Sequence, residues 1–168
     1  MKIVAYTALV LLIVPLQVVL SDRISIAGIH PDLALIAVCL IGLYRGEMDA
    51  LLAGFALGLT QDLFSGGAHW GNLCLKPIIG MIAGLASRNL ASLTWAFVLG
   101  FLFTLSTFSG TIMYLLKSLT GSGVNFFEAA RGIILPQACY DALLGFALLK
   151  LLHLRRPHRA SLTAFTYE

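Results

Sequence analysis

Three ionisable side chains occur inside apolar stretches of the sequence, where a charged group is energetically costly. Asp62, Lys76 and Asp141 lie within or at the end of long runs of apolar residues. Hydrocarbon tolerates few charged groups, and a carboxylate deep in a membrane-spanning helix costs about 2.5–3.5 kcal/mol on insertion scales. These residues are therefore candidates for anchoring helices to each other or for contacting a partner or ligand.

Asp62 follows an apolar helical segment and precedes the paired glycines Gly66 and Gly67. One interpretation is a cap or hydrogen-bonding anchor for the glycine turn, and the other is a group that contacts a partner or ligand. Lys76 has two interpretations as well. The chain reverses between the two residues, so Lys76 either pairs with Asp62 or extends its ammonium group to the membrane interface.

Asp141 follows Gln137 by about one helical turn, and Pro136 weakens the helix there and frees a backbone carbonyl. A channel or transporter could use such a group. However, two acids and one lysine make a poor proton path, so the sequence does not favour transport.

The patterns typical of enzymes do not occur. The four histidines fall in predicted loops or in the tail, without His-x-x-x-His spacing. Ser65 lacks the Gly-x-Ser-x-Gly context of a nucleophile, and a phosphate-binding Gly-Lys-Ser/Thr loop is missing. The three cysteines have no Cys-x-x-Cys spacing and are expected to be buried small apolar residues. The sequence predicts a protein that is not an enzyme and that holds neither metal nor cofactor.

The composition indicates the elements that must position these residues. Of 168 residues, 59% are hydrophobic and 11% are charged, whereas a soluble domain has roughly 25% charged residues. We therefore expect an all-α integral membrane protein surrounded by membrane lipid. The net charge of +3 gives no support to nucleic-acid binding.

The apolar runs predict a six-transmembrane-helix bundle over residues 1–155, followed by a basic cytoplasmic tail at 156–168. The expected spans are 3–20, 32–44, 48–64, 73–87, 93–116 and 132–152. With both termini in the cytoplasm, seven of the 11 Lys and Arg residues lie on that side and four on the other. This bias depends on the basic residues near the C-terminus.

Two glycine pairs have the small-x-x-x-small spacing that lets helix backbones approach closely in lipid. They are Gly54 with Gly58 and Gly80 with Gly84. Packing within the chain is favoured over a dimer interface.

Three short motifs in the second and third predicted spans resemble those of a known family. They are Pro31-Asp32-Leu33 at the start of the second span, Leu43-Tyr44-Arg45-Gly46 at its end, and Gly54-Phe55-x-x-Gly58-Leu59-x-x-Asp62-x-x-Ser65-Gly66 through the third. With the length, the span number and the basic tail, they resemble the rod shape-determining protein MreD family over about residues 1–155.

The resemblance implies a non-enzymatic scaffold in the bacterial cytoplasmic (inner) membrane. Such proteins bind MreC and, through it, act with MreB, RodA and its partner transpeptidase in lateral peptidoglycan synthesis and rod shape. The resemblance also implies a fold similar to the substrate-binding subunit of energy-coupling-factor transporters. Two alternatives stay open. One is a vitamin-type carrier subunit with a cavity involving Trp70, Asn72 and Asn125, and the other is a pore-forming protein.

Overall fold

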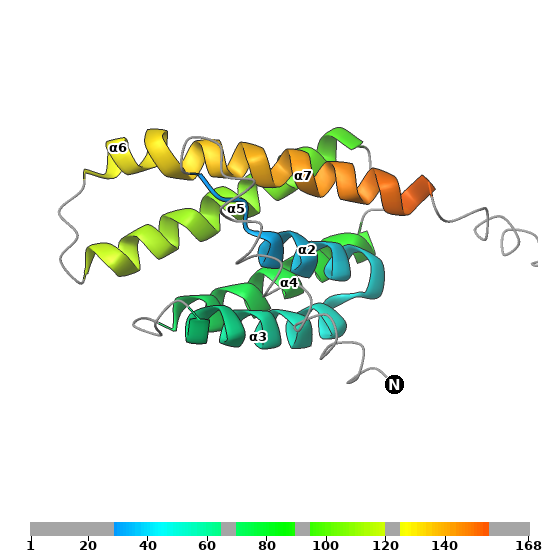
Figure 1. Cartoon of the computed structure of the whole chain (residues 1–168). Coiled ribbons are helices and arrows are strands. Elements are labelled where there is room, and N and C mark those ends of the chain that lie inside the picture. Colours follow the sequence, from blue (N-terminus) through cyan, green and yellow to red (C-terminus); the bar gives the residue numbers. More distant parts are fainter. Residues whose placement is uncertain (1–28, 65–69, 90–94, 120–124, 155–168) are drawn as a thin grey trace, which may run out of the picture.

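A computed structural model of the chain describes residues 29–64, 70–89, 95–119 and 125–154, and this part is all-helical (Figure 1). The prediction of an all-α fold is confirmed for these residues. The predicted span 3–20, the glycines Gly66 and Gly67, and the tail 156–168 lie outside the described residues.

The helices occupy the predicted apolar runs, with one difference. Their bounds are α2 Leu33–Arg45, α3 Glu47–Phe64, α4 Gly71–Asn89, α5 Trp95–Ser118, α6 Phe126–Ala129, a π-helical segment Ala130–Ile134, and α7 Leu135–Leu154. The last helical run therefore begins at Phe126, earlier than the expected 132. The loop predicted before it is correspondingly shorter.

The described helices form two groups (Figure 1). α2, α3 and α4 pack against one another, with the closest association between α3 and α4. α5 packs along α7, and α2 touches both groups. The main core joins them, because buried apolar residues of α2, α4, α5 and α7 form one cluster that includes Leu35, Ile79, Leu102 and Ala142.

Local sequence explains the tight connection between α2 and α3. Asp32 is the N-cap of α2, and its side chain accepts a hydrogen bond from the Leu35 backbone NH. Gly46 ends the helix with a φ of 95°, a conformation that glycine adopts without a steric penalty. One residue is therefore enough to turn the chain from α2 into α3.

The glycines of the small-residue pattern pack α3 against α4. A Cβ atom at Gly54 would lie 2.6 Å from the Lys76 carbonyl oxygen, and one at Gly58 would collide with the carbonyl of Asn72. On the other helix, a Cβ at Gly80 would lie 2.6 Å from the Ala50 carbonyl oxygen, and one at Gly84 would meet the Glu47 backbone. Both glycine pairs thus lie at an interface within the chain.

The π-helical segment ends at Ile134, two residues before Pro136. Proline has no backbone NH, and its ring crowds the carbonyl four residues earlier. The Leu135 NH bonds to the carbonyl of Ala130, five residues earlier, as in a π-bulge. The buried residues Ala129 and Ile134, five apart, both contribute to the same cavity wall.

Two helices among the described residues are long and apolar enough to cross a membrane, Ala96–Ser118 and Phe126–Leu151. α2 has 13 residues, so at 1.5 Å per residue it is about 20 Å long, against about 30 Å for the hydrocarbon core of a bilayer. Large apolar side chains are exposed on α3, α4, α5 and α7, among them Leu52 at 56% and Leu143 at 62%.

Candidate functional site

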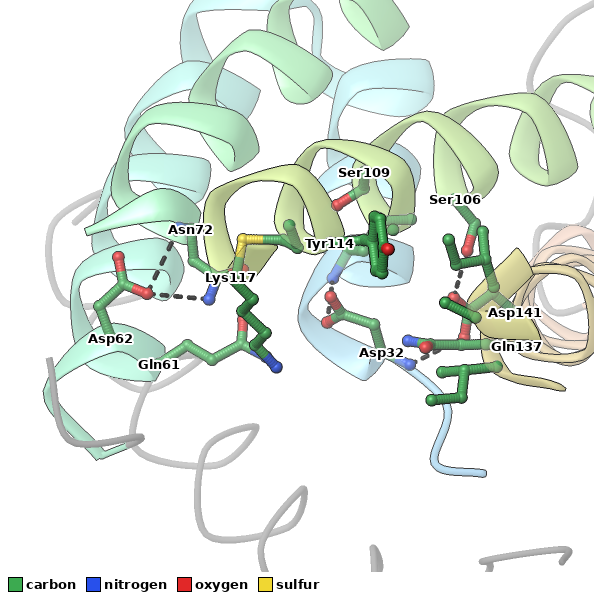
Figure 2. A pocket seen from close by; sticks show the side chains of 16 residues that line it. Asp32, Gln61, Asp62, Asn72, Ser106, Ser109, Tyr114, Lys117, Gln137 and Asp141 are labelled. Atoms are coloured by element: carbon green, nitrogen blue, oxygen red, sulfur yellow. Dashed lines mark hydrogen bonds between the residues drawn. The ribbon is translucent and has the colours of Figure 1, made fainter. Parts of the chain in front are cut away.

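A cavity of about 420 Å³ lies between the two helix groups, near the end of the molecule where α3 and α5 finish and α4 and α6 begin (Figure 2). Its polar lining residues are Asp32, Gln61, Asp62, Asn72, Ser106, Ser109, Tyr114, Lys117, Gln137 and Asp141. Apolar side chains such as Leu35, Met113 and Ile134 complete the wall. Figure 2 shows two polar groups, one around Asp62 and Asn72 and the other around Asp32 and Asp141.

The group around Asp32 is a buried polar network that joins four helices. The Lys76 ammonium lies 2.5 Å from Asp32 Oδ2, and the Asp32 backbone NH donates to Asp141 Oδ1 at 2.8 Å. The Ser106 hydroxyl donates to Asp141 Oδ2 at 2.6 Å. The network therefore connects α4, the start of α2, α7 and α5.

Burial makes this network energetically important. Lys76 and Asp141 are each 0% exposed, and an ammonium or carboxylate without a partner at such a depth is strongly unfavourable. Asp32 balances the charge of Lys76 while its other oxygen caps α2. Asp141 accepts hydrogen bonds from two neutral donors, one of which is the Asp32 NH just before α2.

The group around Asp62 fixes the start of α4. Asp62 Oδ1 accepts hydrogen bonds from the Asn72 side-chain amide at 2.8 Å and from its backbone NH at 3.3 Å. Asp62 Oδ2 accepts one from the Leu73 NH at 2.8 Å. Two of these donors are orphan amides of the first helical turn. Asp62 therefore caps a helix that is not its own, across the connection whose residues 65–69 are not described.

Of the two alternatives for Lys76, the ion pair with Asp62 is not formed, because Lys76 pairs with Asp32 instead. Asp62 is occupied by Asn72 and Leu73 at the first turn of α4, whereas Lys76 lies about one turn further along that helix. Its ammonium reaches the start of α2 and does not extend to the interface.

The structure separates the predicted site residues into two sets. Asp62 and Asp141 line the cavity, and Lys76 supports it through Asp32. The four glycines of α3 and α4 do not line the cavity but lie in the α3–α4 contact. They are Gly54, Gly58, Gly80 and Gly84.

Sequence reasoning missed the roles of Asp32, Ser106 and Ser109. Asp32 was noted only as part of the Pro31-Asp32-Leu33 motif at the start of the second span, and a neutral serine in an apolar helix gives little signal. Among the residues considered for a carrier cavity, Asn72 lines it. Trp70 and Asn125 are exposed and do not.

The described residues contain no cluster of three or more His, Cys, Asp or Glu side chains that could hold a metal ion. Cys39 is buried, but Cys74 and Cys139 are exposed. The expectation that all three cysteines are buried is therefore wrong for two of them, which lie on outward faces of α4 and α7.

No protein-family model matches this chain, and neither a curated protein nor a solved structure is significantly similar to it. The family resemblance seen in the sequence thus stays a prediction, as does the likeness to transporter subunits.

Proposed function

We propose that this protein is a membrane scaffold of the MreD type, which binds MreC and supports lateral peptidoglycan synthesis and rod shape. In this proposal it is a multi-pass protein of the bacterial inner membrane with both termini in the cytoplasm. Its work is to hold neighbouring proteins in place, without making or breaking covalent bonds.

The observation that carries this proposal is the role of the residues that resemble the family. Asp32 caps α2 and pairs with Lys76, and Asp62 caps α4. Gly54 and Gly58 bring α3 against the α4 backbone. The motif therefore specifies a three-helix framework, which is what a family defined by a scaffold fold would share.

The exposed surface supports placement in a bilayer. Large apolar side chains are exposed along most of the described helices, including Leu52 and Phe55 of α3 and Ile78 and Leu85 of α4. Exposed large apolar side chains in this number are typical of a surface that contacts lipid or other proteins. In this proposal, lipid and partner proteins together cover the exposed apolar side chains of α3 and α4.

Co-purification tests the proposal. The chain, expressed with an MreC protein, should be found in the membrane fraction and should elute with MreC after mild detergent extraction. Asp62→Asn keeps an acceptor oxygen for α4 and should retain the complex, whereas Asp62→Leu removes the cap and should lose it. Recovery from the soluble fraction, or wild-type protein that never elutes with MreC, would reject the scaffold role.

The cavity favours a second candidate function, a small-molecule carrier subunit. A volume of about 420 Å³ lies within the range of roughly 300–1,000 Å³ typical of ligand pockets. Thermal unfolding with a vitamin panel separates the two candidates, because only a carrier should gain stability from one of these compounds.

A further inference from the structure

The carboxylates among the described lining residues of the cavity are already occupied by groups of the protein. Asp32 pairs with Lys76 and accepts a hydrogen bond from the Leu35 NH. Asp62 accepts three hydrogen bonds from the first turn of α4, and Asp141 accepts two from neutral donors. These acids therefore do not require a cationic ligand, and a ligand should be recognised by neutral polar groups of the wall.

Gln137 is a neutral polar group of this wall that the helix framework does not use. It is half-buried, and its carboxamide forms no hydrogen bond with any residue that the structure describes. Figure 2 shows its side chain extending from α7 into the cavity. An amide in a largely apolar setting gains free energy when it finds hydrogen-bonding partners, so a ligand that supplies them would be held at this point.

The helix register explains why Gln137 faces the cavity. Ile134, Gln137 and Asp141 follow one another at intervals of three and four residues, so they share one face of the helix, and all three line the cavity. Their neighbours Pro136 and Ala138 do not line it. Because Asp141 anchors this face to the start of α2, the carboxamide has a fixed position in the cavity.

Apolar and aromatic side chains surround the rest of the cavity. They include Leu35 of α2, Met113 and Tyr114 of α5, and Ile133 of the π-helical segment. Ile133 is exposed, so the cavity reaches the surface beside it. A ligand would thus meet the carboxamide of Gln137 with one edge and apolar side chains around its body.

A carboxamide presents an acceptor oxygen and a donor NH2 side by side. A lactam presents the complementary pair, so the two groups can exchange two hydrogen bonds. We propose that this cavity binds a neutral ring compound with a lactam-type amide, whose NH and carbonyl pair with Gln137 and whose ring packs against Met113 and Tyr114. The proposal names a ligand class for the carrier function considered above, on which its biological role rests, and it can fail while binding of MreC is retained.

Three compounds with the same two-ring body test the proposal on the full chain in detergent. Carbostyril has a lactam NH and carbonyl, N-methylcarbostyril keeps only the carbonyl, and N-methylquinolinium is a cation. We expect carbostyril to raise the unfolding temperature and to give saturable binding by calorimetry. N-methylcarbostyril should bind about tenfold more weakly, because the Gln137 oxygen is left without a donor. N-methylquinolinium should bind more weakly still, because it offers the carboxamide neither group.

A variant of α7 shows whether the effect belongs to the carboxamide. Gln137→Met keeps an unbranched side chain and should unfold at or slightly above the wild-type temperature, because no hydrogen bond within the described structure is lost. It should bind carbostyril about tenfold more weakly and lose the preference for carbostyril over N-methylcarbostyril, which assigns the lost affinity to the lactam pair. Cys139→Ser, at an exposed position of the same helix outside the cavity wall, should bind like the wild type.

Equal effects of the three compounds on the wild type would mean partition into detergent and would overturn the proposal. It would also be overturned by absent carbostyril binding, by carbostyril binding that is unchanged in Gln137→Met, or by a cation that binds best, since the carboxylates would then be the recognised groups. Co-elution with MreC and the vitamin panel are measured on the same preparation. A vitamin that stabilises the protein when carbostyril does not would keep the carrier function and reject this ligand class.

Discussion

Replacement of the buried lysine tests the central network most directly. Lys76 is 0% exposed and its partner Asp32 is 13% exposed. Lys76→Met keeps an unbranched side chain of similar length but leaves the Asp32 carboxylate without its cation. Removal of one partner of a buried ion pair typically costs 3–5 kcal/mol. At roughly 2–4 °C per kcal/mol for a chain of this size, the unfolding temperature should fall by about 6 to 20 °C.

The double variant separates the pair from the packing. Lys76→Met combined with Asp32→Asn leaves no unpaired charge and retains an oxygen that can cap α2, so it should recover more than half of the loss. The assay is unfolding of the detergent-solubilised protein by heat and by a denaturing detergent. Lys150→Met, at an exposed lysine of α7, is the control and should change stability by less than about 0.5 kcal/mol. Strictly additive losses, or a loss below about 1 kcal/mol for Lys76→Met, would refute the buried pair.

Three further predictions concern the framework. Gly58→Ala should destabilise the protein by about 1–3 kcal/mol, because the added Cβ would collide with the α4 backbone. Gly100→Ala is the control in the same unfolding assay. It should be neutral or slightly stabilising, because there is open space around Gly100. Asp62→Leu should cost about 2–4 kcal/mol and Asp62→Asn about half as much, because Leu removes both oxygens that accept from Asn72 and Leu73, whereas Asn keeps one. Equal losses would contradict the capping role. A maleimide reagent should modify the exposed Cys74 and Cys139 in the folded protein and the buried Cys39 only after unfolding, so intact mass should show two additions before unfolding and three after it.

The positions of the helices were predictable because apolar runs and their polar breaks are local signals. α3 at Glu47–Phe64 and α5 at Trp95–Ser118 lie within a few residues of the expected 48–64 and 93–116. The glycine spacing on α3 similarly indicated a packing face. Whether each helix crosses the bilayer stays a prediction.

The partners of the charged residues could not be predicted, because they depend on tertiary structure. Lys76 and Asp32 are 44 residues apart, and Asp32 and Asp141 are 109 apart. From sequence, Asp62 was the nearest acid before Lys76 at a chain reversal, and that proximity suggested the wrong pair. Only the packing of α4 on α2 decides which carboxylate the lysine reaches.

Because Ala130–Ile134 is a π-helical segment, deletion of one residue should be tolerated there but not further along α7. A chain one residue shorter between 131 and 133 would close the stretch into an ordinary α-helix, with Ala129 four residues before Ile134 and both still facing inward. One deletion between Ala138 and Asp141 would instead rotate the two parts by about 100° relative to each other and turn Asp141 away from Asp32. Related chains should therefore differ in length between residues 131 and 133 more often than between Ala138 and Asp141.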